Sequence, residues 1–488
     1  MKNRPMFVAV CFLMAVTMHR YSVAREPGEV SDIEAASTAD KWLLENSIHL
    51  YRLSNEIWRT PELGFQEHKA CELLATRLES NGFSVERNVA QMKTAFVAKF
   101  GSGSPTIALL AEYDALPGMS QKLWPTREQE SPGAPGHACG HNLLGVASVE
   151  AAIAVKEAIV QHKIPGTVIV FGTPAEEGGG GKVYMVRDGF FEGVDAVLAW
   201  HPDVANYVRA GSSLALRRMR FRFTGVAAHA ALKPDEGKSA LDAVELMNVG
   251  VNFLREHVPQ DIRIHYVISR GGERPNVVPA EAESWYYVRG PKMSLVNLVT
   301  DRVSDIANGA CLMTGAKVEM RDLSGTHEIL SNQVLAGVVH EQLHHVGAPP
   351  FDAEDIEFGR KIERELNPEK LGDSPLAEEV LPIVADRLMA SSDVGDVSWV
   401  VPTVELRVAT TVKHAAAHTW AFTATAGGPI GNKGGLTAAR VLARSAVVLL
   451  MDSERLSAAK EEFRQQAKDY TYSSPIPAGV RPPEKIDP

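Results

Sequence analysis

Uninterrupted apolar runs separated by helical stretches fill the first part of the chain. Three of these runs cover residues 106–110, 167–171 and 196–200. A strand that is apolar along its whole length is typical of a sheet with helices on both faces, and this favours parallel pairing. Apolar residues at helical spacing predict helices over residues 40–59, 67–81 and 143–161. Together these elements predict an α/β fold in which a mostly parallel sheet is sandwiched by helices.

The pattern changes in the middle of the chain, where apolar and polar residues begin to alternate. Alternation over residues 219–223, 263–269 and 281–289 predicts half-exposed antiparallel strands. Helices are predicted between them over 239–257 and 295–309, and we expect one more strand after the second helix. This β-α-β-β-α-β order is that of a ferredoxin-like α+β unit. We therefore expect a small domain inserted into a larger one.

The N-terminus has the features of a cleaved signal peptide. Basic residues precede an apolar run at 7–16, and a small-x-small site ends at Ala24. A membrane anchor is the alternative, but the run is shorter than the about 20 residues that span a bilayer. We expect a periplasmic or secreted protein with no membrane segment in its mature form. The five expected segments are the signal peptide (1–24), the larger domain in two parts (25–213 and 329–472), the inserted domain (214–328) and a Pro-rich surface tail (473–488).

Composition narrows the class of protein. Charged residues make up 23% of the chain, which is ordinary for a globular protein and excludes wholesale disorder. The net charge of −10 argues against a nucleic-acid-binding protein, which would normally carry a basic face. The four cysteines include no CxxC pair and cannot form a disulfide framework for so long a chain.

Polar motifs follow each of the three apolar runs. Glu112 and Asp114 follow the first run, Glu176 and Glu177 follow the second, and His201 follows the third. Ligands of open parallel sheets bind at the carboxyl ends of the strands, so these side chains are expected at one edge. A further motif, H-A-C-G-H at 137–141, lies just before the predicted helix 143–161. Each residue alone is more often an ordinary buried or solvated side chain, but together they indicate a divalent-metal site.

The adjacent carboxylates can have different roles. One can bind a metal while its neighbour acts as a general base toward a metal-activated water. Four glycines at 178–181 let the backbone approach a metal or substrate closely. They are not a phosphate-binding loop, because Val183 follows Lys182 where that motif requires Ser or Thr.

A second motif competes for the role of metal site. His340, Glu341 and His344 form H-E-x-x-H within a plausible helix at 332–346, and Glu363 or Glu365 could supply a third ligand. The longer zinc-protease signature fails, because Pro350 stands where its last His belongs. The alternative is an amphipathic surface helix.

In combination, these motifs resemble those of a known family. The sequence resembles the co-catalytic metallopeptidases and amidohydrolases that include aminoacylase, carboxypeptidase G and the auxin-conjugate hydrolases, particularly their aminobenzoyl-glutamate hydrolase branch. The resemblance covers nearly the whole mature chain, and its specific stretches are W-R-T-P-E-L-G-F-Q-E (58–67), H-A-C-G-H (137–141), P-A-E-E-G-G-G (174–180), G-V-A-A-H-A-A (225–231) and S-A-L-D-A-V-E (239–245). It implies a co-catalytic zinc-peptidase type of fold with an inserted lid or dimerisation domain.

The resemblance also assigns roles to individual positions. The implied ligands of two divalent metal ions, Zn or Mn, are Cys139, His141, Glu177, His201 and His418. The implied general base is Glu176. His229 matches a lid residue that, in family dimers, reaches the partner's site and stabilises the oxyanion. Asn276 matches a residue that contacts the substrate's carboxylate end, and Arg289 is a weaker candidate for that contact.

Some positions depart from the common pattern. Glu112 stands where many relatives have a metal-binding His, so Asp114 is expected to support the site rather than ligate. The stretch S-S-D-V-G-D-V-S at 391–398 is like the aminobenzoyl-glutamate branch and unlike the auxin hydrolases. His414 competes with His418 as the last ligand, and we favour His418 because the following H-T-W and Gly-rich loop match that branch.

These observations lead to the expectation of a metal-dependent hydrolase. The expected reaction is cleavage of the amide bond of N-acyl amino acids with aromatic acyl groups, such as aminobenzoyl-glutamate, by a homodimer joined through the inserted domain. The alternatives are a dipeptidase or carboxypeptidase of the same fold, and a non-enzymatic metal- or amino-acid-binding protein. The sequence leaves open the preferred acyl group and amino acid, the metal, and the need for a second, different subunit.

Overall fold

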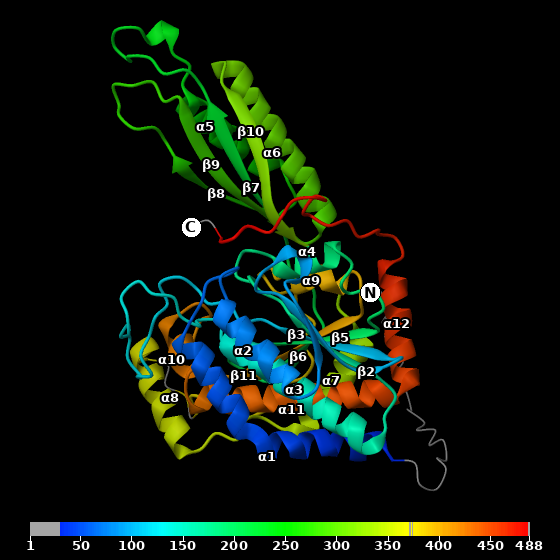
Figure 1. Cartoon of the computed structure of the whole chain (residues 1–488). Helices are drawn as coiled ribbons and strands as arrows, with labels where there is room; N and C mark the ends of the chain where they lie inside the picture. The colour runs from blue at the N-terminus through cyan, green and yellow to red at the C-terminus, as the bar shows by residue number, and fades with distance from the viewer. Residues whose placement is uncertain (1–29, 370–371, 373, 487–488) are drawn as a thin grey trace, which may run out of the picture.

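The chain forms a larger α/β domain and a smaller domain inserted into it (Figure 1). The computed structural model describes residues 30–369, 372 and 374–486, so the signal peptide predicted at 1–24 lies outside the described residues. The inserted domain, called the lid below, begins with β7 (Ala215–Thr224) and ends with β10 (Lys317–Thr326). Both connections lie at the same end of the lid, which therefore projects from the larger domain (Figure 1).

A seven-stranded sheet forms the centre of the larger domain, in the order β1-β2-β4-β3-β5-β11-β6. Its four middle strands are parallel to one another. They are β4 (Gly166–Gly172), β3 (Thr106–Ala111), β5 (Ala196–Asp203) and β11 (Thr403–Ala409). The outer strands pair antiparallel and are β1 (Ser84–Arg87), β2 (Phe96–Ser102) and β6 (Tyr207–Arg209). The predicted parallel core is confirmed, and antiparallel strands extend it on both sides.

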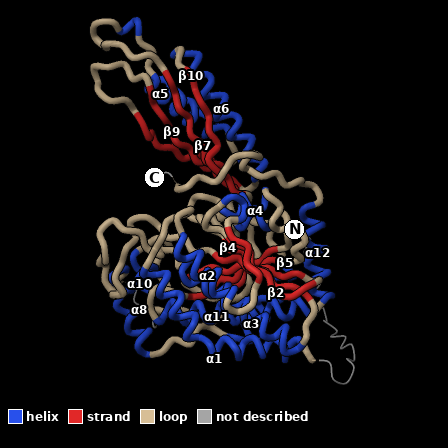
Figure 2. Tube along the Cα trace, viewed as in Figure 1, coloured by secondary structure: helices blue, strands red, loops and turns tan. Residues whose placement is uncertain are grey.

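Helices cover both faces of this sheet, as the apolar strands predicted (Figure 2). The first face packs against α1 (Asp32–Arg59), α2 (His68–Glu79), α3 (His141–His162), α7 (Gln333–Val346), α11 (Pro429–Met451) and α12 (Ser453–Ala467). The second face packs against two short helices, α4 (Gly181–Arg187) and α9 (Val394–Ser398). A smaller cluster of apolar side chains joins α8 (Ala353–Leu366) and α10 (Trp420–Ala426). Helix α1 begins eight residues earlier than predicted, because Ser31 caps it and acidic residues occupy its first turn.

Helix α11 combines length with an apolar composition. Within the described part of the chain it is the one helix long and apolar enough to cross a membrane, by length and composition alone. However, 89% of its most apolar window is buried inside the protein. It packs against α1, α3 and α7, so its apolar surface is that of a core helix.

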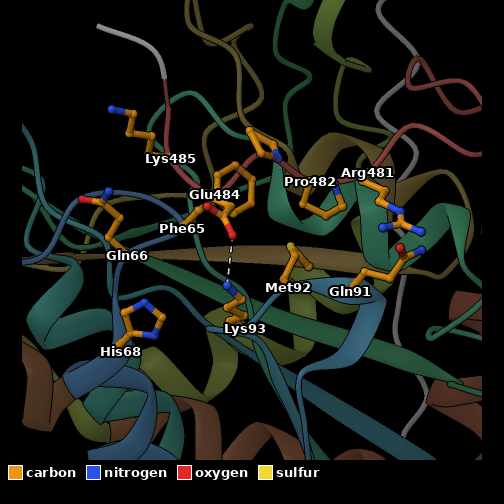
Figure 3. Close-up of a pocket in the computed structure, with 11 residues that line it drawn as sticks. Phe65, Gln66, His68, Gln91, Met92, Lys93, Arg481, Pro482, Glu484 and Lys485 are labelled. Atoms are coloured by element: carbon orange, nitrogen blue, oxygen red, sulfur yellow. Dashed lines mark hydrogen bonds and ion pairs between the residues drawn. The ribbon is translucent and has the colours of Figure 1, made fainter.

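Most of the C-terminal tail is exposed on the surface, as its composition predicted, but part of it is anchored in the protein. It runs between the two domains (Figure 1), and the side chain of Ile476 is only 2% exposed in the apolar layer of the second sheet face. Lys93 forms an ion pair with Glu484 of the tail at 3.0 Å (Figure 3). The tail and the loops around residues 65–68 and 91–93 line a cavity of about 900 Å³. Pro-rich composition indicated an irregular segment, but it could not show what the segment packs against.

The lid has the predicted β-α-β-β-α-β order. Its four antiparallel strands lie in the order β10-β7-β9-β8, with β8 at Arg263–Arg270 and β9 at Glu281–Gly290. Helices α5 (Ala240–Leu254) and α6 (Met293–Thr314) pack on one face of this sheet. The ferredoxin-like fold of the inserted domain is therefore confirmed.

Candidate metal centre

Three parallel strands bring the candidate ligands to one edge of the central sheet. Glu112 and Asp114 follow the end of β3, Glu176 and Glu177 lie in the loop after β4, and His201 lies within β5. Because β3 pairs in parallel with both neighbours, the carboxyl ends of all three strands meet there. The loop after β4 also contacts the lid, because Arg218 of β7 donates a hydrogen bond to the Gly178 carbonyl.

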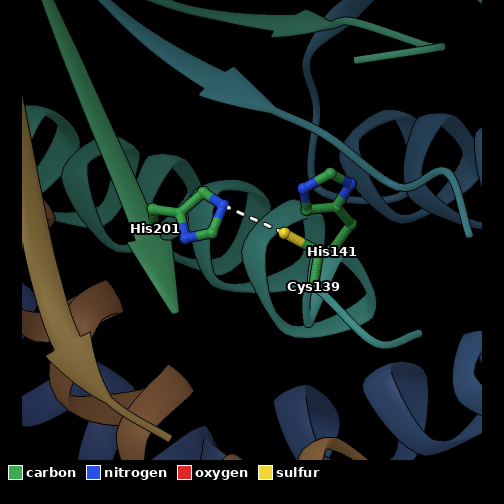
Figure 4. Close-up of side chains that lie close together, drawn as sticks. All are labelled: Cys139, His141 and His201. Atoms are coloured by element: carbon green, nitrogen blue, oxygen red, sulfur yellow. Dashed lines mark hydrogen bonds between the residues drawn. The ribbon is translucent and has the colours of Figure 1, made fainter. Parts of the chain in front are cut away.

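A left-handed turn adds two more candidate ligands. Gly140 has a φ of 76°, and an added Cβ would lie 2.9 Å from the side chain of Pro202. Only glycine adopts this turn without strain. Cys139 comes directly before the turn, and His141 is the first residue of α3, so both side chains point toward His201 (Figure 4).

The first group of ligands is Cys139, His141 and His201. Cys139 Sγ lies 3.3 Å from His201 Nε2. His141 Nδ1 bonds to the Asp114 carboxylate at 2.9 Å, and His201 Nδ1 bonds to the Pro202 carbonyl at 2.6 Å. Both oxygens can only accept, so each Nδ1 donates its proton there, and Nε2 is the ring atom that remains for a metal. Metal-binding histidines are typically held in this way through their second ring nitrogen.

The second group is Cys139, Glu177 and His418. His418 Nε2 lies 3.2 Å from Glu177 Oε1, and its backbone N–H donates to the Ala138 carbonyl at 3.0 Å. Hydrogen bonds that the His418 ring donates to Cys139 and Glu177 raise the pKa of His418 to about 10. His418 has a φ of 62°, a conformation unusual for a residue with a side chain.

His414, the competing candidate, points elsewhere. Its Nδ1 lies 2.7 Å from Glu363 Oε2, and its backbone N–H donates to Glu363 Oε1 at 3.0 Å. Glu363 is buried and anchors the loop that carries both histidines. The structure therefore brings His418, and not His414, to the other ligand candidates.

The two groups fit divalent metal ions. In each group the candidate ligand atoms lie within 4.8 Å of one another, and Cys139 belongs to both. The buried atoms His141 Nε2 and Glu177 Oε1 form no hydrogen bond of regular geometry among the described residues, although Glu112 Oε2 and His418 Nε2 lie 3.3 and 3.2 Å from them. Buried polar atoms are normally paired, so these two are suited to a cation. Thiolate, imidazole and carboxylate donors together suit Zn²⁺ and similar ions.

Glu176 lies beside these groups rather than in them. It shares a third cluster with Glu112 and His141, again within 4.8 Å. Burial and the nearby charges of Glu112 and Glu177 raise the pKa of Glu176 well above its ordinary value. A carboxylate in such surroundings is a stronger base than one in water.

The lid residues named from the sequence lie in two places. The backbones of His229 and Val277 form a β-bridge, and Ala230 N–H donates to the Asn276 carbonyl at 3.1 Å, so His229 and Asn276 are neighbours. The loops that carry them are at the end of the lid that points away from the larger domain (Figure 1). Arg289 lies near the other end, where it donates to Ser391 Oγ at 3.1 Å. The chain therefore does not bring its own His229 to its own ligand cluster.

The H-E-x-x-H motif does not form a comparable cluster. It lies on α7, where the rings of His340 and His344 are 4.5 Å apart, and His340 Nε2 bonds to the Leu381 carbonyl. Glu363, one expected third ligand, is engaged by His414, and Glu341 pairs with Arg455. Within the described residues, neither histidine belongs to a group of three close ligand atoms. The structure supports the alternative of an ordinary amphipathic helix.

Two buried side chains at the site were missed from the sequence. Glu67 accepts a hydrogen bond from Ala175 N–H at 2.8 Å and so holds the residue before Glu176, which has a φ of 59°. Lys182 is fully buried and pairs with Glu112 and Asp393 at 2.7 Å each. Glu67 ends the first family-like stretch, which was a usable signal, whereas the sequence around Lys182 suggested only a comparison with a phosphate loop.

Comparisons with known proteins point to the same chemistry. Residues 108–470 match the profile described as peptidase family M20/M25/M40. The chain is 41% identical over 456 residues to one of the subunits of p-aminobenzoyl-glutamate hydrolase from Escherichia coli, and the match covers 88% of this chain and 95% of the relative. It is 30% identical to the Xaa-Arg dipeptidase of Mus musculus, over 90% of this chain and 95% of the relative. A solved structure of a dinuclear metal-binding M20 peptidase from Bacillus subtilis shares the fold, with a TM-score of 0.58, 19% identity, and coverage of 83% of this chain and 98% of that one.

The two histidines of the 410–418 loop can be distinguished by metal analysis. We expect His418→Ala to lower the affinity for one metal ion. Loss of a residue that only supports a ligand typically costs about 10–100-fold in affinity, and loss of the ligand itself should cost at least as much. His414→Ala is the matched control and should keep the wild-type metal content. Equilibrium dialysis with elemental analysis measures both, and a loss of metal from His414→Ala alone would reverse the assignment.

Proposed function

Because this chain belongs to peptidase family M20/M25/M40 and is a metal-dependent hydrolase of amide bonds, we propose that it cleaves N-acyl amino acids with an aromatic acyl group, such as aminobenzoyl-glutamate. The observation that carries the proposal is the position of Glu176 beside two groups of three metal-ligand atoms. The 41% identity to a component of an aminobenzoyl-glutamate hydrolase, over nearly the whole chain, supports this substrate class.

Two divalent metal ions, Zn²⁺ or Mn²⁺, fit the site. Cys139, His141 and His201 would hold one ion, and Cys139, Glu177 and His418 would hold the other. When bound, such ions polarise the substrate carbonyl and lower the pKa of water. Asp114 fixes the ring of His141 and also accepts the backbone N–H of Glu177 at 2.8 Å, so one carboxylate orients a ligand from each group.

Glu176 moves the proton that the reaction requires. A water molecule attacks the amide carbonyl, and Glu176 takes the proton that this water loses. Glu176 then donates the proton to the leaving nitrogen as the C–N bond breaks, which releases the acyl carboxylic acid and the amino acid. The raised pKa of Glu176 suits both steps, because the group must accept a proton and later give it back.

Replacement of the base tests the mechanism. We expect Glu176→Gln to lower kcat for aminobenzoyl-glutamate by about 100–10,000-fold, the usual contribution of a general base. The variant should still bind metal, because Glu176 lies outside the two ligand groups. Steady-state kinetics and elemental analysis of the same preparation give the two readouts, and wild-type turnover by the variant would contradict the mechanism.

A second candidate activity is cleavage of dipeptides. It is favoured by the 30% identity to an Xaa-Arg dipeptidase over 90% of this chain. Both activities use the same metal groups and base, so a panel of aromatic acyl-Glu, acyl-Asp and Xaa-Arg substrates in the kinetic assay separates them.

We also propose that the active protein is a homodimer in which the lid of one copy completes the site of the other. His229 Nδ1 accepts the backbone N–H of Leu232 at 3.1 Å, so the ring proton is on Nε2, which can donate to an oxyanion. In its own chain this group is at the distal end of the lid (Figure 1). A different subunit is the alternative partner, since the Escherichia coli relative is named as one subunit of its enzyme.

A mixing experiment tests this trans arrangement. In the proposed dimer, each site uses Glu176 from one copy and His229 from the other. A mixed dimer of Glu176→Gln and His229→Ala copies therefore has one site with both residues intact. After dissociation and equal remixing, we expect about a quarter of wild-type activity to return, as random pairing of copies predicts. Differently tagged copies show whether mixed dimers form. Mixed dimers without recovered activity would exclude the trans role of His229.

Export of the protein is also proposed from the signal-like N-terminus. N-terminal sequencing of the protein purified from its native source should begin at or near Arg25. Retention of the apolar run at 7–16 in the mature protein would contradict cleavage.

A further inference from the structure

The metal centre borders a buried cluster of three charged side chains. Lys182 is the second residue of α4 and is fully buried, and Glu112 and Asp393 are 3% and 1% exposed. Lys182 Nζ lies 2.7 Å from Glu112 Oε1 and 2.7 Å from Asp393 Oδ1, and its backbone N–H donates to Asp393 Oδ2 at 3.0 Å. Burying three charges is costly, and apolar residues of similar volume are often at least as stable. The cluster therefore calls for a role other than stability.

Glu112 connects this cluster to the ligands. Its second oxygen, Oε2, is buried without a hydrogen-bond partner among the described residues and lies 3.3 Å from His141 Nε2. Glu112, His141 and Glu176 also form the third group of close ligand atoms. By geometry alone, this third group is a competing site for a divalent cation.

A cation in the third group would disable the proposed reaction. It would use the Glu176 carboxylate as a ligand, so that Glu176 could no longer accept a proton. It would also compete for His141, which belongs to the first ligand group. A site with a free base therefore needs something that keeps metal away from Glu112.

We propose that Lys182 is a positioning residue that occupies Glu112 as an internal cation, and so limits the centre to two metal ions and leaves Glu176 free. The ammonium group provides the positive charge that Glu112 and Asp393 would otherwise obtain from a metal. This inference rests on the proposed metal-dependent function and adds a determinant of metal number to it.

Metal counting tests the role of Lys182. The variants Lys182→Met, Glu112→Gln and the double variant are dialysed against Mn²⁺, which carboxylate-rich sites accept readily, and metal per chain is measured by elemental analysis. We expect Lys182→Met to bind about one ion more per chain than the wild type, because the Glu112 carboxylate is released. Glu112→Gln and the double variant should bind as many ions as the wild type. Lys156→Met is a matched control, since this lysine pairs with Glu157 on α3, away from the ligand groups.

Several outcomes would overturn the inference. An unchanged metal count in Lys182→Met would show that Lys182 does not exclude a cation. Loss of an ion from Glu112→Gln would show that Glu112 is itself a ligand, and this outcome remains decisive if Lys182→Met fails to fold. An extra ion in the double variant would place the added site elsewhere. A wild-type protein without metal or amidase activity would overturn the proposed function as well, whereas equal counts in every variant would overturn the role of Lys182 alone.

Discussion

The carboxylate of Asp114 is the contact on which the geometry of the site depends. One oxygen holds His141 Nδ1 at 2.9 Å, and the other accepts the backbone N–H of Glu177 at 2.8 Å. Burial alone would raise the pKa of Asp114, but the charge and hydrogen bond of His141 lower it, so the group is ionised. Because Asp114 follows β3, between β4 and β5, it can join the loop after β4 to the start of α3. The parallel pairing of these strands thus determines where the candidate metal ligands meet.

Strained backbone and buried charge surround this contact. Ala175 and His418 both have positive φ angles, which cost residues other than glycine about 1 kcal/mol or more. The backbone N–H of Ala175 donates to the Glu67 carboxylate, and the backbone N–H of His418 donates to the Ala138 carbonyl. Each residue is thus held by a group outside its own loop. Such strained conformations persist only where surrounding contacts hold them in place. Here they direct the carboxylates that follow Ala175 and the imidazole of His418 toward a common centre. The fold therefore loses some stability at this edge in exchange for a defined arrangement of ligands.

Sequence patterns predicted the parts of the fold and site that depend on local chemistry. The apolar runs of β3, β4 and β5 were recognisable because both faces of each strand are buried, and the ligand motifs were recognisable because they follow those strands directly. The outer strands gave no comparable signal, since β1 and β6 have only four and three residues and β2 is buried only over its first three residues. The choice between His414 and His418 depends on Glu363, 51 residues away from His414. Asp393, one of the two partners of Lys182, is 211 residues away from it, and no local pattern connects the two.

The proposed metal ligands and the proposed oxyanion donor lie in different domains of the chain. All five proposed metal ligands come from the larger domain, and the contacts that orient them, from Asp114 to Glu363, come from it as well. The proposed oxyanion donor, His229, lies at the distal end of the lid, where a backbone N–H donates to its ring and a β-bridge joins its backbone to Val277. A metal centre of this kind can assemble within one chain, because the lid supplies none of its proposed ligands. If His229 acts in trans as proposed, completion of the catalytic site depends on the approach of a second lid, so dimer association would be required for catalysis and not for metal binding.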